Sequence, residues 1–217
     1  PVLDEGHALA ARLAALQPLR ARGAEVVVVD GGSTDDSWRI ACLHADRVLL
    51  APRGRAAQMQ AGAATTTTAT ASTLLFLHAD TVLPPGADRR IAQAIDAGAL
   101  WGRFDVRIDS RRPLLRLVSA MVNLRSRCTG VATGDQAIFV RRTLFEQVGG
   151  FADTALMEDV ALSKTLRRHG PPACLRDRVT TSARRWEKHG VLRTIVLMWA
   201  LRARYVFGAD PAALAAR

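Results

Sequence analysis

The chain has 217 residues, of which 49% are hydrophobic and 23% are charged, a composition typical of a folded globular protein and not of a disordered or fibrous one. Its length suits one domain with a sizeable core. No run of about 18 uncharged apolar residues occurs, so the sequence predicts no membrane-spanning helix. The cysteines at 42, 128 and 174 are far apart. This spacing excludes a disulfide scaffold or a cysteine-rich zinc module and favours a reducing, cytoplasmic setting.

The net charge of +10 is distributed unevenly along the chain. Residues 1–100 carry a net charge of −1, whereas residues 101–217 carry +11. A basic half can attract an anionic ligand, a nucleic acid or an anionic membrane surface. An Ala- and Arg-rich sequence also places arginine wherever a surface cation is tolerated, so charge alone does not choose among these alternatives.

The first hundred residues alternate between helical and strand patterns. Apolar spacing and end signals predict helices over 8–22, 36–45, 55–71 and 84–97. Apolar, β-branched runs predict strands over 25–30, 47–50 and 73–77. This order predicts a doubly wound, mostly parallel sheet with its ligand site at the carboxyl ends of the strands. Residues 1–6 resemble the exit from a strand, so we expect the natural polypeptide to begin several residues earlier.

The second half is less regular. Strands are predicted over 100–108 and 135–140, and helices over 113–127, 143–148 and 159–169. The segment from Val191 to Phe207 is apolar nearly all round and predicts a buried or interface-lying helix. No linker or internal repeat divides the chain, so we expect one α/β domain over residues 1–217.

Polar residues follow two of the predicted strands. Asp30 precedes two glycines, where a carboxylate can accept hydrogen bonds from a ligand, or can simply cap the turn. His78 and Asp80 point to the same side of the chain. Asp80 suits a divalent cation bound to a diphosphate, whereas a lone histidine such as His78 is more often a structural residue.

Three further segments carry side chains suited to binding or catalysis. Glu158 and Asp159 open a helix, where acids are favoured by the dipole but can also provide a general base. Arg185 and Trp186 combine a phosphate-binding cation with an aromatic face suited to a sugar ring. Arg55 stands at the start of a predicted helix and can hold an anion there.

The order of these segments resembles that of the family 2 glycosyltransferases of the GT-A fold, and the match covers nearly the whole chain. His78-Ala79-Asp80 stands in the place of the family's Asp-x-Asp metal motif. The other matching segments are Pro1–Glu5, Val28–Asp35, Gly134–Arg142, Val148–Phe151, Met157–Val160 and Arg185-Trp186. The details are similar to those of a compact bacterial subgroup associated with radical-SAM or selenium-related gene clusters.

The resemblance implies a single Rossmann-like GT-A domain, with a nucleotide-binding half over about 1–100 and an acceptor-binding half over about 101–217. It implies that the donor is a nucleoside diphosphate sugar, with UDP as the default nucleotide. The implied roles are a nucleotide site at Glu5, Asp30 and Arg55; an Mn²⁺ or Mg²⁺ site at Asp80 and His78; a general base at Asp159 with Glu158 beside it; and acceptor contacts at Asp135, Arg185 and Trp186.

A single displacement at the anomeric carbon would invert the sugar's configuration, and the acceptor would be a hydroxyl compound, with a lipid-linked one as an open alternative. His78 and Ser182 depart from the family's motifs, and the second departure argues against polymer synthesis. The rival functions are a sugar nucleotidyltransferase, a glycoside hydrolase and a non-catalytic basic module that binds anions or membranes. Only 5% of residues are aromatic, so we expect no nucleic-acid partner. We expect a cytoplasmic location, with the inner face of the membrane as an alternative through Arg112, Arg116 and residues 191–207.

Overall fold

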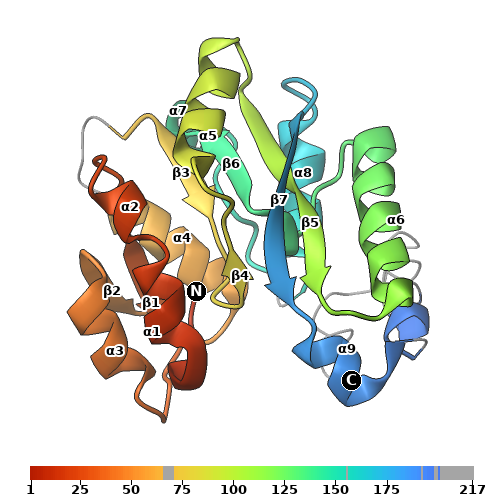
Figure 1. Cartoon of the computed structure of the whole chain (residues 1–217). Helices are drawn as coiled ribbons and strands as arrows, with labels where there is room; N and C mark the ends of the chain where they lie inside the picture. Colours follow the sequence, from red (N-terminus) through yellow and green to blue (C-terminus); the bar gives the residue numbers. More distant parts are fainter. Residues whose placement is uncertain (66–70, 155, 192, 198–199, 201–217) are drawn as a thin grey trace.

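The structure is a computed structural model that describes residues 1–65, 71–154, 156–191, 193–197 and 200. Its strands form two groups, a parallel pair and a five-stranded sheet, with helices packed around both (Figure 1). The α/β class expected from the sequence is confirmed.

The parallel pair is built from the N-terminal quarter of the chain. β1 (Val27–Asp30) and β2 (Arg47–Leu50) run side by side and are connected by α3 (Ser37–His44). Val2 extends this pairing, since its amide donates to the Val29 carbonyl over 2.9 Å and its carbonyl accepts from Gly31. The helices α1 (Gly6–Ala14) and α2 (Gln17–Arg20) precede the pair, and α4 (Arg55–Thr65) packs against β1.

The five-stranded sheet has the order β3–β6–β5–β7–β4. Its strands are β3 (Thr73–Phe76), β4 (Thr81–Val82), β5 (Trp101–Asp109), β6 (Ile138–Arg141) and β7 (Ala173–Ser182). β5 and β7 are parallel, whereas β6 runs antiparallel to β3 and β5, and β4 runs antiparallel to β7. A cavity of about 630 Å³ is lined by residues of β1 and β3, so the two strand groups meet across a gap.

Four helices cover the large sheet. α5 (Ala87–Asp96) shares a buried apolar cluster with β5 and β6, while α7 (Arg142–Gln147) and α8 (Glu158–Leu166) enclose another around Trp101 and Phe76. α6 (Pro113–Thr129) lies along β5 (Figure 1). The short helix α9 (Arg184–His189) follows β7 directly.

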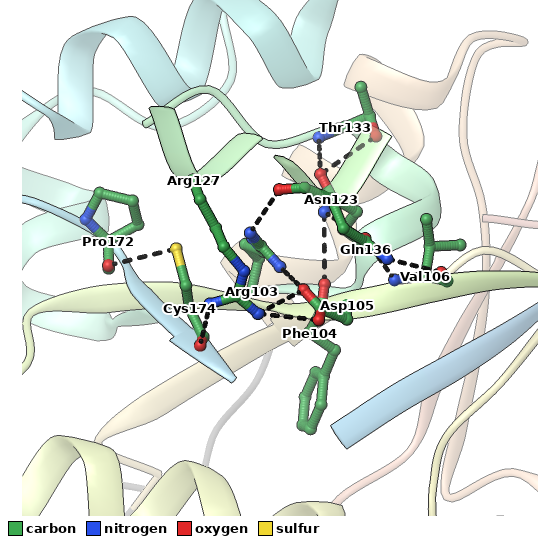
Figure 2. Close-up of polar contacts among 10 residues, drawn as sticks. All are labelled: Arg103, Phe104, Asp105, Val106, Asn123, Arg127, Thr133, Gln136, Pro172 and Cys174. Carbon is green, nitrogen blue, oxygen red and sulfur yellow. Dashed lines mark hydrogen bonds and ion pairs between the residues drawn. The ribbon is translucent and has the colours of Figure 1, made fainter. Parts of the chain in front are cut away.

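α6 also satisfies the backbone of β5 where β6 no longer pairs with it. The buried Asn123 side chain accepts from the Val106 amide over 2.8 Å and donates to the Val106 carbonyl over 2.9 Å (Figure 2). Ser119 accepts from the Ile108 amide in the same way. These side chains replace a neighbouring strand and hold α6 on the sheet.

Asn123→Ala is therefore expected to lower the free energy of unfolding by about 1–3 kcal/mol, because it leaves two buried backbone groups without partners. Chemical denaturation monitored by circular dichroism measures the change. Ser110→Ala, directly after β5, is the control and should have little effect, because the Ser110 side chain accepts only a 3.3 Å hydrogen bond from the Arg112 amide. An unchanged stability in Asn123→Ala would mean that water replaces the side chain.

Most predicted elements are confirmed, with differences at their ends. The predicted helix over 8–22 is two helices, because Pro18 has no amide hydrogen to continue the first. α5 begins at Ala87 and not at Pro84, after the left-handed Gly86. The start of the predicted strand over 135–140 is wrong: Gly134–Gln136 form a 3₁₀ turn, η1, closed by Thr133 and Gln136.

Two predicted helices extend beyond the described residues, and two strands were not predicted. α4 is described to Thr65, and residues 66–70 of its predicted range lie outside the described part. Residues 193–197 of the predicted helix over 191–207 are helical, and most of the remainder is not described. β4 and β7 are the unpredicted strands. No helix in the described part of the chain is long and apolar enough to span a membrane.

Candidate active site

The N-terminal segment is bound to the loop after β1. The Asp4 amide donates to Ser33, the Glu5 amide to Ser37 over 2.9 Å, and the Gly6 amide to the Asp35 carboxylate over 2.8 Å. Hydrogen bonds from Ser37, with a smaller contribution from Gly6, lower the pKa of Asp35. Two segments that were expected to face the nucleotide are thus held together.

Asp30 lies at the carboxyl end of β1 and is almost fully buried. Its Oδ1 accepts from the amides of Gly32 and Ser33 over 2.7 and 2.6 Å, so it does cap the turn. Its Oδ2 is buried and has no hydrogen-bond partner among the described residues. A buried carboxylate oxygen without a partner is costly, and a ligand donor would satisfy it.

His78 and the η1 turn form the centre of the site. The His78 ring lies against Gly134, where any Cβ would collide with it, so this position requires glycine. His78 Nδ1 lies 3.5 Å from Asp135 Oδ1. The Gly134 amide donates to Asp159 Oδ2 over 2.7 Å. Residues from three distant segments therefore meet at one point.

Asp159 and Glu158 open α8 but differ in environment. Asp159 is half-buried, and its two oxygens accept from the Gly134 and Val160 amides, each over 2.7 Å. Glu158 is buried, and this burial, together with the charge of Asp159, raises the pKa of Glu158 above its ordinary value of 4.5. Arg55 and His78 act on the pKa of the same carboxyl in the opposite direction, as smaller contributions.

The raised pKa of Glu158 predicts a pH-dependent effect on stability. Between 4.5 and its folded pKa, the folded state binds a proton that the unfolded state releases, so stability falls as the pH rises through this window. Glu158→Gln removes this pH-dependent loss of stability, because glutamine does not ionise. We expect its Tm to exceed that of the wild type at pH 7.5 and to match it below pH 4.5, in thermal scans followed by circular dichroism.

Glu146→Gln, on an exposed part of α7, is the control and should show no such pH dependence. A Glu158→Gln Tm that is lower than that of the wild type at pH 7.5 would contradict the pKa direction.

A buried polar network supports the η1 turn from behind (Figure 2). Gln136 is fully buried; its Oε1 accepts from the Thr133 amide and its Nε2 donates to the Phe104 carbonyl. Beside it, Asp105 binds the buried Arg103 and accepts two 2.8 Å hydrogen bonds from Arg127. This network fixes the turn against β5, and with it the Gly134 amide that orients Asp159.

Asp80 lies in the turn between β3 and β4. Its carbonyl accepts from the Ser182 amide over 3.1 Å, so the turn is attached to the end of β7. Its half-buried carboxylate accepts from Thr81 over 3.2 Å. Asp80 is thus placed on the same edge of the sheet as the last residue of β7.

The donor set near Asp80 fits a divalent cation in part. Both ring nitrogens of His78 are buried without a hydrogen-bond partner among the described residues. Imidazole and carboxylate groups suit Mn²⁺. The described residues contain no group of three or more acidic, histidine or cysteine side chains able to hold a metal alone. The protein can therefore supply some ligands, and the rest must come from a bound ligand or water.

α9 differs from what its motif predicted. Trp186 does not project into an open site; its indole is buried with Ile108, Leu115 and Val118. The Arg185 side chain lies outside the described part of the structure. Arg184, the other cation of this segment, donates two 2.8 Å hydrogen bonds to Glu5 and contacts His7, a connection that the sequence did not predict. The arginine beside the predicted one therefore joins α9 to the N-terminal segment.

The structure thus brings together His78, Asp135 and Asp159, with Glu158 next to Asp159 at the start of α8. Glu5 is joined to Arg184, and Asp30 lies behind the loop that binds residues 4–6. Gln136 was missed as a supporting residue. Its signal was its position beside Asp135, since Thr133 and Gln136 have the spacing of a capping box.

Comparison with known proteins identifies the class. Residues 1–147 match the sequence profile of glycosyl transferase family 2, which is more than half of the chain. The chain therefore belongs to glycosyl transferase family 2. A search of curated proteins found no significant match.

Solved structures support the GT-A fold. Mannosyltransferase PcManGT from Pyrobaculum calidifontis, in complex with GDP-Man and Mn²⁺, matches with a TM-score of 0.61 and 21% identity over 98% of this chain and 64% of its own. Glucosyl-3-phosphoglycerate synthase from Mycobacterium tuberculosis, in complex with Mn²⁺ and UDP-glucose, matches with a TM-score of 0.59 and 18% identity. The match covers 83% of this chain and 67% of the synthase. TarS from S. aureus matches with a TM-score of 0.61 and 16% identity, over 84% of this chain and 59% of the TarS structure. The chain spans less than two thirds of PcManGT and of the TarS structure.

Proposed function

We propose that the protein transfers a sugar from a nucleoside diphosphate sugar to a hydroxyl acceptor, with inversion at the anomeric carbon. The observation that carries this proposal is the placement of Asp159. Two backbone amides, those of Gly134 and Val160, donate hydrogen bonds to its carboxylate. The Gly134 amide belongs to the same turn as Asp135, which lies beside His78. A carboxylate that is fixed in this way can act as a general base on an acceptor hydroxyl.

The donor site is formed by the N-terminal segment and the ends of β1 and α4. Glu5, Asp30 and Arg55 are its proposed nucleotide-binding residues. The buried, unpaired Oδ2 of Asp30 supports this role, because a base or ribose donor would complete its hydrogen bonding. Arg55, the first residue of α4, is suited to a phosphate. The neighbours' complexes with UDP-glucose and GDP-Man support a nucleotide-sugar donor. We propose UDP as the nucleotide.

Asp80 and His78 are the proposed protein ligands of a divalent cation, Mn²⁺ or Mg²⁺. When bound, such a cation would neutralise charge on the leaving diphosphate. Two observations support this assignment: both ring nitrogens of His78 are buried without a hydrogen-bond partner among the described residues, and Mn²⁺ is bound in two similar structures.

The proposed chemistry is a single displacement. The acceptor oxygen forms a bond to the anomeric carbon while the bond to the diphosphate oxygen breaks, and the diphosphate leaves with that electron pair. The acceptor proton passes to Asp159. Glu158 is the neighbour of this base, and its burial, together with the charge of Asp159, raises the pKa of Glu158. An α-linked donor then gives a β-linked product.

The acceptor would lie beside Asp135, whose side chain is about half exposed. Arg185 is retained as a proposed acceptor contact, whereas the buried Trp186 is assigned to packing. We further propose that the chain is one domain, that it works in the cytoplasm, and that it belongs to the compact subgroup that its sequence resembles.

The stereochemistry of transfer tests this proposal. UDP-α-glucose and GDP-α-mannose are incubated with the protein, Mn²⁺ and a panel of hydroxyl acceptors that includes phosphoglycerate, and products are followed by proton NMR. We expect β-linked sugar. A product with the donor's α-configuration would overturn the single displacement, because retention requires a different mechanism.

A further inference from the structure

One face of α6 carries a continuous stripe of exposed apolar side chains. Leu114, Leu117, Met121 and Leu124 are 39, 56, 52 and 63% exposed. Their spacing of three and four residues places them on one side of the helix. They make up nearly half of the large apolar residues found exposed in the described part of the chain. Such a stripe is unusual on a soluble surface and indicates a partner.

The opposite face of α6 already accounts for its packing on the sheet. Leu115 and Val118 are buried with Ile108, and the segment at 191–197 joins the same cluster through Val191 and Ile195. This segment adds two more exposed apolar side chains, those of Val196 and Leu197. The exposed stripe is therefore not needed to hold α6 on the sheet.

A basic pocket lies beside the stripe, on the adjoining side of α6. The pocket has a volume of about 820 Å³ and is lined by α6 residues that include Arg116 and Ala120. Its cationic residues are Arg107, Arg111, Arg112, Arg116 and Arg178. Asp109 and Glu187 are its acids, so cations predominate. The guanidinium groups of Arg111, Arg112, Arg116 and Arg178 form no ion pair with any described residue.

The pocket is also close to the catalytic edge of the sheet. It includes Asp109, the last residue of β5, which pairs with Ser182 at the end of β7. The Ser182 amide in turn donates to the Asp80 carbonyl. A surface that bound at the pocket would therefore lie next to the site.

We propose that the α6 stripe and the basic pocket dock the protein on an anionic lipid bilayer. The stripe inserts at the boundary between headgroups and acyl chains, and the pocket arginines bind lipid phosphates. An aliphatic stripe beside unpaired arginines matches both parts of such a surface. A nucleic acid would match only the arginines, and a neutral apolar protein groove only the stripe. This docking does not depend on the proposed transfer reaction.

Vesicle co-sedimentation tests the docking with the full chain. Wild-type protein is mixed with phosphatidylcholine vesicles and with vesicles that also contain phosphatidylglycerol. We expect binding to the anionic vesicles at least ~10-fold tighter than to the neutral ones, and weaker binding as salt increases. Equal binding to both, or no binding to either, would overturn the proposal.

Paired variants separate the two parts of the surface. The double variant Leu117→Glu/Leu124→Glu should bind anionic vesicles at least ~10-fold less tightly, because it removes inserted apolar surface and adds negative charge. Arg112→Ser/Arg116→Ser should lower the affinity for anionic vesicles ~10–30-fold, since each cation near an anionic surface raises this affinity ~5-fold. The matched controls are Leu43→Glu, on the equally exposed part of α3, and Arg39→Ser.

A loss of binding in the controls that equals the loss in the α6 variants would overturn the proposal, because any exposed leucine or arginine would then serve. Sedimentation velocity without lipid tests whether a second copy of the chain covers the stripe instead of a membrane. A wild-type dimer that Leu117→Glu/Leu124→Glu converts to a monomer would also overturn it, because the stripe would then be covered by a second copy of the chain.

Discussion

Asp159→Asn is expected to lower the transfer rate by about 10²–10⁴-fold, the contribution typical of a positioned general base. Asparagine has the same shape, and its side-chain oxygen can still accept from the Gly134 amide, so the side chain should keep its place although the hydrogen bond from the Val160 amide is lost. It cannot take the acceptor's proton. Release of nucleoside diphosphate from the donor sugar measures the rate.

The affinity for nucleotide should stay within about twofold of the wild type in this variant, because Asp159 acts on the acceptor and not on the nucleotide. Asp153→Asn, an exposed carboxylate in the loop before α8, is the matched control and should keep full activity. Full activity in Asp159→Asn would remove Asp159 as the base.

Asp80→Ala is expected to abolish the effect of Mn²⁺ on nucleotide binding. Changes at metal sites commonly cost about 10–100-fold in metal affinity, and the loss of a direct ligand should be at least as large. The diphosphate affinity of the variant in Mn²⁺ should therefore fall to the value measured in EDTA. Isothermal titration calorimetry measures both affinities.

Asp96→Ala, at the exposed end of α5, is the control for this change and should bind like the wild type. Asp80→Ala should also keep its circular dichroism spectrum, because the turn is held to β7 through the Asp80 backbone. A variant that binds the diphosphate with undiminished dependence on Mn²⁺ would show that the metal is held elsewhere.

The first half of the fold was predictable because its signals are local. The run Val26–Val29 predicted β1, and the capping and glycine signals around it predicted the neighbouring helices. β7 was not predicted, because Arg176, Asp177 and Arg178 interrupt its apolar pattern. Its pairing with β5 and β4 depends on residues far away in the sequence, which a local pattern does not contain.

The site was predictable as separate segments but not as an assembly. Strand and helix ends marked Asp30, His78 and Asp159 as candidates. The contact of His78 with Gly134 depends on tertiary packing, as does the hydrogen bond from Gly134 to Asp159. Trp186 was assigned to the site but belongs to the core. A tryptophan beside an arginine suits a sugar site or a core equally well, and only the packing of α9 against α6 shows that this one is buried.

The most direct test of the account is a calorimetric titration of the protein with UDP, GDP, dTDP and CDP, each with Mn²⁺ and with EDTA. A donor site that shares a cation with a diphosphate predicts that one of these nucleotides, which we expect to be UDP, binds in Mn²⁺ and loses most of its affinity in EDTA. Binding of equal strength in EDTA would contradict the metal site at Asp80 and His78, and binding of none of the four would contradict the donor site itself.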